Sequence, residues 1–113
     1  MLESVVTAAL TSALNSLSDR QNAIADNIAN VNTPGYRAKR VMFEDALAAS
    51  VKAGDGHVAA TTALSLEPTQ TNGNNVNLDT ETLSNVETTL RYQFAAQAVN
   101  GEFTSMRTAL KTQ

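Results

Sequence analysis

The chain has 113 residues, a length that suits one small domain and excludes a large multidomain machine. Apolar residues make up 42%, but eighteen of them are alanine and only 4% of the chain is aromatic, so a monomer has a thin core. The net charge of −3 argues against nucleic-acid binding. The only basic cluster consists of Arg37, Lys39 and Arg40, and three charges give little affinity for phosphate. The absence of cysteine excludes disulfides, thiolate metal sites and a cysteine nucleophile.

The N-terminal segment MLESVVTAALTSALNSL does not have the pattern of a secretory signal. It lacks a basic start, and polar residues interrupt its apolar positions. No run of eighteen or more apolar residues occurs, so we expect no transmembrane helix. If the protein leaves the cytoplasm, we expect a route that cleaves no signal peptide.

Residues 2 to about 31 are predicted to form one long helix, without an internal proline or glycine. Ser18 followed by Gln21 is a capping-box pattern that could start a helix there, but the apolar period keeps its phase across it. Steps of four and three residues form a seam in which Gln21 is the polar member. The apolar members of this seam are Leu10, Leu14, Leu17, Ile24, Ile28 and Val31.

A turn is predicted directly after this helix. Asn30 suits a helix end because asparagine tolerates the left-handed conformation. Thr33-Pro34-Gly35-Tyr36 suits a type II turn, with proline at the second position and glycine where φ is positive. A helix end and a turn do not explain Asn27, one turn earlier, or the aromatic ring of Tyr36. Amides spaced three apart on a helix can bind a backbone that folds back over it, so we expect a structural role for this element.

The middle of the chain carries weaker patterns. Residues 41–51 are predicted to form a short helix, with Phe43, Leu47 and Val51 on one face. Residues 52–77 are rich in Gly, Thr and Asn and show no sustained period, so we expect a flexible or loop-like segment. A stretch this long without structure suggests a functional role or ordering by a partner.

A second long helix is predicted from about residue 80 to 111. Asp79 is the expected N-cap, with Leu78 and Leu83 placed as a hydrophobic staple. The apolar positions again follow steps of three and four, with a slip near Ala98. They are Leu83, Val86, Leu90, Phe94, Val99, Phe103, Met106 and Leu110.

Together these patterns predict an all-α fold in which two long terminal helices form a coiled-coil-like hairpin. Residues 1–36 hold the first helix and its turn, 37–77 the short helix and flexible middle, and 78–113 the last helix of one structural unit. An alanine-rich pair of helices is marginal alone, so we expect both apolar seams to serve as an assembly interface with other chains.

Catalytic and metal-binding patterns are weak. His57 lies in a flexible stretch without a nucleophile or an orienting scaffold around it, which favours a solvated loop histidine over acid–base chemistry. The oxygen-rich residues between Asn72 and Asp79 lack the spacing of a calcium-binding loop and favour a turn before a capped helix. No glycine-rich phosphate loop is present. We therefore expect no enzyme activity, no metal and no cofactor.

Two segments carry a specific resemblance. DNIANVNTPGYRAKRVMFEDAL resembles the N-terminal signature of the bacterial flagellar axial proteins, the rod and hook family, and its Thr33-Pro34-Gly35-Tyr36 turn is similar to that of rod members. NGNNVNLDTETLSNVETTLRYQFAAQAVNGEFTSMRTAL is similar to the C-terminal half of the same proteins. The resemblance covers both long helices and the turn, and leaves only about residues 50 to 70 unmatched.

The resemblance implies a structural subunit of the proximal rod in the flagellar basal body. It implies export through the flagellar type III apparatus without a cleaved signal, followed by helical assembly that transmits torque. Its implied neighbours are copies of itself, other rod proteins, the rod-base adaptor protein, the MS ring and the export gate. The alternative from another class is a small helical secreted effector or adaptor that binds one partner through its amphipathic helices.

Overall fold

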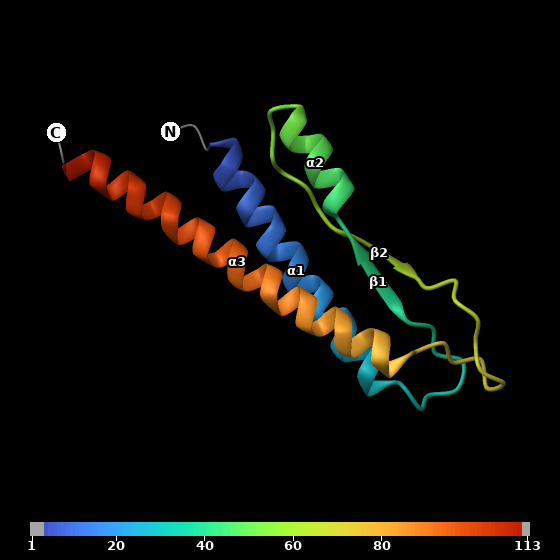
Figure 1. Cartoon of the computed structure of the whole chain (residues 1–113). Helices are drawn as coiled ribbons and strands as arrows, with labels where there is room; N and C mark the ends of the chain where they lie inside the picture. The colour runs from blue at the N-terminus through green and yellow to red at the C-terminus, as the bar shows by residue number, and fades with distance from the viewer. Residues whose placement is uncertain (1–3, 112–113) are drawn as a thin grey trace.

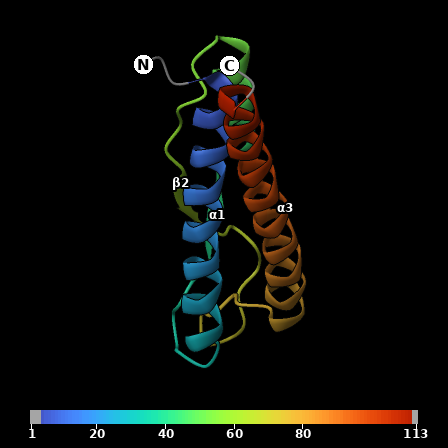
Figure 2. The same ribbon diagram turned by 90° about the vertical axis from the view of Figure 1, so that its left-hand side faces the viewer.

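The computed structural model describes residues 4–111, which form an elongated molecule of 66 × 25 × 16 Å (Figure 1). The elements in chain order are α1 (Val5–Ala29), β1 (Lys39–Met42), α2 (Glu44–Lys52), β2 (Thr61–Leu64) and α3 (Leu78–Lys111). The long helices α1 and α3 run in opposite directions as a hairpin, while α2 and the two strands lie along α1 (Figures 1 and 2). Within residues 4–111, no helix is long and apolar enough to cross a membrane.

Helix α1 is continuous, as its unbroken apolar period predicts. The Ser4 side chain caps its start by accepting a hydrogen bond from the Thr7 amide at 3.0 Å. Ser18 and Gln21 lie inside the helix, so their capping-box pattern does not mark a start. The predicted helix also included residues 2 and 3, which lie outside the described residues. Asn30 caps the C-terminus with a negative φ of −108°, without the left-handed conformation that we expected.

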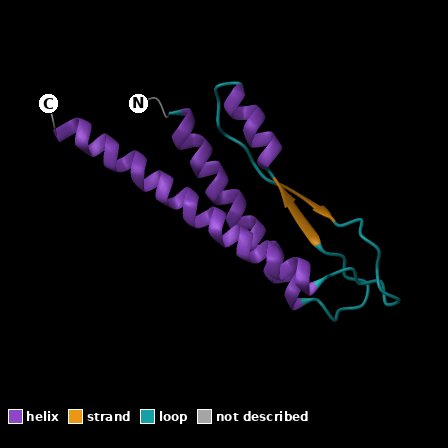
Figure 3. Cartoon of the chain, viewed as in Figure 1, coloured by secondary structure: helices purple, strands orange, loops and turns teal. Residues whose placement is uncertain are grey.

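The prediction of an all-α fold is wrong in one respect, because the middle segment contains a small antiparallel sheet (Figure 3). Lys39 pairs with Leu64 and Met42 pairs with Thr61 at the two ends of the ladder. All four side chains of β2 are exposed, so the strand has no alternation of apolar and polar residues that could reveal it. A ladder of four residues depends on backbone pairing more than on a sequence pattern.

The short helix begins later than predicted. Val41 and Met42 belong to β1, so α2 starts at Glu44 instead of residue 41. Arg20 of α1 fixes this junction, since its guanidinium donates to the Val41 carbonyl at 2.7 Å and to both carboxylate oxygens of Glu44 at 2.6 and 2.7 Å. These bonds from Arg20 lower the pKa of Glu44 to about 2, so its carboxylate is charged at neutral pH.

The start of α3 also differs from the prediction. The helix begins at Leu78, and the side chain of Asn77 accepts from the amides of Asp79 at 3.0 Å and Thr80 at 3.3 Å. Asn77 is therefore the N-cap, and Asp79 lies inside the first turn. The expected staple between Leu78 and Leu83 loses its basis, because both side chains are exposed.

The core is thin and lies mainly between α1, β1 and α3. Helix α3 faces α1 with Glu81, Thr88 and Ala95, which are its buried residues. The small size of Thr88 and Ala95 lets the two helices approach closely, but it limits the apolar area that they bury. The buried hydrophobic residues are Ala8, Leu17, Ala23, Ile24, Ala38, Val41, Phe43, Val76 and Ala95.

A loop after α2 is fastened to the N-terminal half of α1. The Ser12 hydroxyl donates to the Gly56 carbonyl at 3.0 Å and accepts from the Val58 amide at 3.1 Å. Gly56 has a φ of +85°, and a Cβ placed there would lie 2.6 Å from the Val5 carbonyl oxygen. Glycine is therefore required at this position for two reasons, its backbone angle and the close approach of α1.

Alanine substitutions at Gly54 and Gly56 distinguish the effect of the backbone angle from the effect of the close approach. Gly54 has the same φ of +85°, but no atom lies within 4 Å of an added methyl group there. We expect Gly54→Ala to cost about 1–2 kcal/mol of unfolding free energy from the backbone angle alone. Gly56→Ala should cost clearly more, because the backbone of Val5 must also move. Urea unfolding followed by circular dichroism measures both, and equal losses would contradict the close approach.

Candidate functional site

The turn after α1 has the predicted geometry. The Tyr36 amide donates to the Thr33 carbonyl at 3.2 Å, and Gly35 has a φ of +75°, as a type II turn requires. Thr33, Pro34 and Gly35 are exposed at the end of the hairpin, whereas Tyr36 is half-buried. The turn thus closes one end of the molecule and directs the chain back along α1 into β1 (Figure 3).

Asn27 joins α1 to the returning chain and is fully buried. Its side-chain amide pairs with the backbone of Lys39, accepting from the Lys39 amide at 2.8 Å and donating to the Lys39 carbonyl at 3.0 Å. The same amide accepts from the Tyr36 hydroxyl at 3.1 Å and donates to Glu81 at 3.1 Å. Burial raises the pKa of the Tyr36 phenol, which keeps it protonated as the donor. All hydrogen-bonding positions of the Asn27 amide are therefore used.

Glu81 brings α3 into the same polar cluster. Its side chain is fully buried, with one carboxylate oxygen 2.7 Å from Arg40 of β1 and the other 3.1 Å from Asn27. A buried carboxylate needs such partners, because an unpaired charge in a protein interior is strongly unfavourable. Asn27, Arg40 and Glu81, which we call the polar latch, connect α1, β1 and the first turn of α3.

A second asparagine stabilises the end of α1 from a distant part of the chain. Asn74 is fully buried, and its amide nitrogen donates to the carbonyls of Asn30 at 2.9 Å and Thr33 at 2.8 Å. Its side-chain oxygen accepts from the Val76 amide at 2.8 Å. Each of these carbonyls also accepts from an amide of the turn, Asn30 from Thr33 at 3.0 Å and Thr33 from Tyr36 at 3.2 Å. Asn74 therefore adds a second donor to each carbonyl and ties the turn to the segment before α3.

Asn75 performs the same task for the strand that leaves the turn. Its side-chain oxygen accepts from the Ala38 amide at 2.7 Å, and its nitrogen donates to the carbonyls of Ser65 and Glu67, both at 3.2 Å. The Gly35 amide also donates to the Asn72 carbonyl at 2.8 Å. The sequence shows the asparagines between residues 72 and 77 but not these contacts, because composition alone does not reveal which carbonyls they meet.

The seam predicted on α1 is used mostly within the chain. Leu17 and Ile24 are buried, and Leu10, Leu14 and Val31 are half-buried. Ile28 is 39% exposed. In this conformation Leu17 and Ile24 are therefore not accessible to another subunit.

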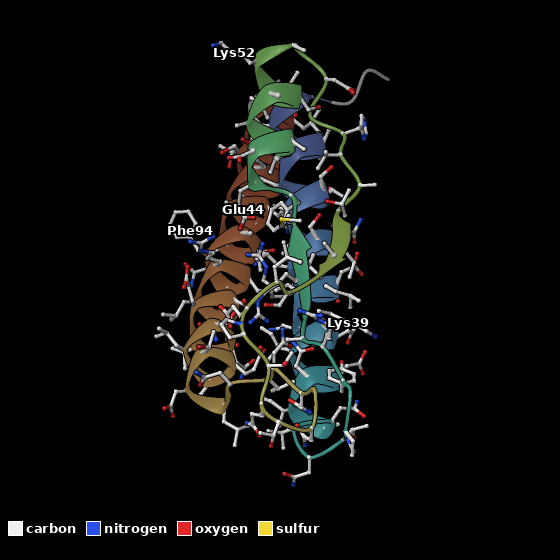
Figure 4. The ribbon with its side chains drawn as sticks, turned by 90° about the vertical axis from the view of Figure 1, so that its right-hand side faces the viewer. Lys39, Glu44, Lys52 and Phe94 are labelled. Carbon is white, nitrogen blue, oxygen red and sulfur yellow. The ribbon has the colours of Figure 1, made fainter. Side chains whose placement is uncertain are left out.

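The seam predicted on α3 is largely exposed. Its first four members lie opposite the face that packs on α1, with exposed fractions between 53% and 75%, and Figure 4 shows Phe94 pointing away from the hairpin. Val99 is half-buried, while the last three members are 41% to 72% exposed. Exposed apolar side chains in such number are uncommon on a monomer. The exposed members are Leu83, Val86, Leu90, Phe94, Phe103, Met106 and Leu110.

The chemistry of the remaining polar groups is structural. His57 is exposed in the loop between α2 and β2. Among residues 4–111, no group of three or more His, Cys, Asp or Glu side chains is placed to hold a metal ion. The polar oxygens of Asn74 and Asn75 bind backbone amides within the chain. The side chains of Asn74 and Asn75 therefore orient backbone segments.

The polar latch gives a direct mutational test. Glu81→Ala leaves Arg40 and Asn27 without their shared acceptor, and removing one partner of a buried ion pair typically costs about 3–5 kcal/mol. We expect Glu81→Ala to lower the free energy of unfolding by an amount near the lower end of this range, because the Arg40 side chain is 31% exposed. Glu87→Ala removes an exposed ion pair from the same helix and should cost about 0.5 kcal/mol or less. Urea unfolding compares them, and similar losses for both variants would contradict a structural role for the latch.

Comparisons with known proteins identify the family of this chain. The family model described as "Flagella basal body rod protein" matches residues 9–37, which include most of α1 and the whole turn. The flagellar basal body rod protein FlgB of Bacillus subtilis (strain 168) is 32% identical, over 89% of each chain. The FlgB proteins of Escherichia coli (strain K12) and Borreliella burgdorferi are 28% and 27% identical, over at least 87% of each chain. This chain therefore belongs to the flagellar basal body rod protein family.

Proposed function

We propose that this chain is a structural subunit of the proximal rod, which assembles through its helices and transmits torque in the flagellar basal body. The observation that carries the proposal is similarity to rod proteins over nearly the whole chain, combined with the exposed apolar residues of α3. The family is a structural one, in agreement with the expectation that the chain is not an enzyme.

The two helices have different tasks in this proposal. Helix α1 uses much of its apolar seam to hold β1 and α3, so it supplies the internal framework of the subunit. Helix α3 contributes small and polar residues to that framework and presents its large apolar side chains outward. Burying these side chains against neighbouring subunits would provide the apolar area that the monomer lacks.

The turn and the polar latch support assembly indirectly. A rod that carries torque needs subunits in which the contact surfaces keep fixed positions relative to one another. The buried amides of Asn27 and Asn74 fix where α1 ends and where the chain turns back. Glu81 then fixes the start of α3, and thereby the direction in which its outer face points.

Partners and export follow from the same proposal. The subunit would pass through the flagellar type III apparatus without a cleaved signal and then assemble in the periplasmic or cell-wall part of the basal body. Its neighbours would be copies of itself, other rod proteins, the rod-base adaptor protein, the MS ring and the export gate. The alternative of a secreted effector or adaptor has less support, because the similarity to rod proteins spans both helices and the segment between them.

The proposal predicts that the chain is present in basal bodies and that the outer face of α3 holds it there. Leu90 is 61% exposed, so Leu90→Asp should leave the isolated subunit as helical as the unsubstituted protein. The same variant should be missing from detergent-resistant basal bodies of motile source cells, because a charge cannot be buried in an apolar contact. Immunoblotting of purified basal bodies and circular dichroism of the free chain provide the two measurements.

Gln93→Asp is the matched control, because it adds the same charge at an exposed polar position of α3. It should enter basal bodies normally. Absence of the unsubstituted chain from basal bodies, with the protein soluble in the cytoplasm or medium, would overturn the rod assignment and favour the adaptor alternative. Normal incorporation of Leu90→Asp would overturn the role of the α3 face.

A further inference from the structure

The apolar residues of α3 form two short rows instead of one continuous row. The first, row 1, contains Leu83, Val86, Leu90 and Phe94, and the second, row 2, contains Val99, Phe103, Met106 and Leu110. Each row spans about three helical turns, but the step from Phe94 to Val99 is five residues. When the directions of the four members of each row are averaged at about 100° per residue, the two rows face in directions that differ by roughly 180°.

The structure agrees with this change of face. Row 1 lies opposite Glu81, Thr88 and Ala95, which are buried against α1. Row 2 continues the line of those buried residues, yet Phe103 is 51% exposed and Leu110 is 72% exposed. The reason is visible in Figure 1, where α3 diverges from α1 toward its C-terminal end. Neither row is fully covered by the described part of the chain.

We propose that row 2 of one subunit packs on row 1 of a second copy of this chain, with the two α3 helices parallel and staggered by sixteen residues. This inference rests on the proposed function as a rod subunit. In this register Leu83 meets Val99, Leu90 meets Met106 and Phe94 meets Leu110, since each pair is sixteen positions apart. The corresponding displacement along the helix axis is about 24 Å.

The placement of the rows on opposite faces determines the type of contact. A two-fold symmetric pair needs the same surface on both copies, so contact between row 1 and row 2 would require both rows on one face. Because the rows point in opposite directions, each copy can bind one neighbour through row 1 and another through row 2. Such head-to-tail contacts do not close after two copies, and they extend into a helical assembly.

Charge placement supports a second copy as the occupant. In the proposed register, Arg91 beside row 1 and Glu102 beside row 2 of the neighbour lie on the same side of the contact. Their separation of five residues along the paired helices corresponds to the flanking e and g positions that form interhelical ion pairs in parallel coiled coils. Arg91 already pairs with Glu44 at 2.9 Å and Glu87 at 2.6 Å in its own subunit. Its side chain is still 49% exposed, so Glu102 of the neighbour would be a third carboxylate around the same guanidinium.

Disulfide cross-linking in assembled basal bodies tests this register without background from native thiols in this chain, because it has no cysteine. Leu90→Cys combined with Met106→Cys should give dimers and larger species on a non-reducing gel after mild oxidation. The two cysteines lie about 24 Å apart within one helix, too far for a bond inside the same chain. Co-producing the two single variants should give only dimers, and either single variant alone should remain monomeric.

The matched control combines Leu90→Cys with Thr108→Cys, because Thr108 lies on the opposite side of α3 from row 2. This pair should give no cross-link. Where the first pair prevents assembly, Leu83→Cys with Val99→Cys tests the same register.

Three results would overturn the inference. A dimer formed by Leu90→Cys alone would indicate a closed symmetric pair through row 1. Cross-links that join this chain only to a different rod protein would exclude a second copy as the occupant. Presence of the doubly substituted chain in basal bodies without any cross-link would exclude the register while leaving the rod function intact. Absence of the unsubstituted chain from basal bodies would instead refute the proposed function itself.

Discussion

The pairing of the Asn27 side chain with the Lys39 backbone is the constraint on which the rest of the structure depends. A single buried amide holds the returning chain against α1 and, through Glu81, holds the start of α3 as well. Because the apolar core is small and rich in alanine, it gives weak discrimination between alternative registers of the two long helices. Buried polar groups that must all find partners discriminate much more strongly, since a shift of one residue leaves several of them unsatisfied.

The use of buried polar groups to set the register explains how a small chain can expose so many large apolar residues. The subunit obtains its internal specificity from amides and one buried ion pair instead of from large side chains. The large side chains of α3 are consequently free to face outward. A subunit selected only for stability as a monomer would turn Leu83, Leu90 and Phe94 inward. Under the proposed function, their outward direction provides the apolar surface that neighbouring subunits would cover.

The long helices, the type II turn and the thin core can be predicted from the sequence, because each depends on local rules. Pro34 and Gly35 dictate the turn, and the unbroken period dictates α1. The sheet cannot be predicted in this way, because Thr61–Leu64 exposes every side chain and its pairing leaves no pattern. Asp79 and Asn77 both suit an N-cap, and only the backbone geometry distinguishes them.

The roles of Asn74 and Glu81 cannot be predicted from the sequence alone. Asn74 binds carbonyls of Asn30 and Thr33, and Glu81 binds Arg40, across more than forty residues of chain. No local rule shows such contacts. Asn27 and the turn could therefore be identified from the sequence, whereas the groups that contact them from distant parts of the chain required the structure.

The buried amides, and not the apolar rows of α3, hold the free subunit together. Amide hydrogen exchange of the isolated chain, followed by NMR, tests it most directly. The amides of Ala38 and Lys39, which bind the side chains of Asn75 and Asn27, should exchange as slowly as those in the centre of α1. The amides of α3 beyond Val99, where the helix diverges from α1, should exchange much faster. Fast exchange at Ala38 and Lys39, together with strong protection beyond Val99, would contradict the account.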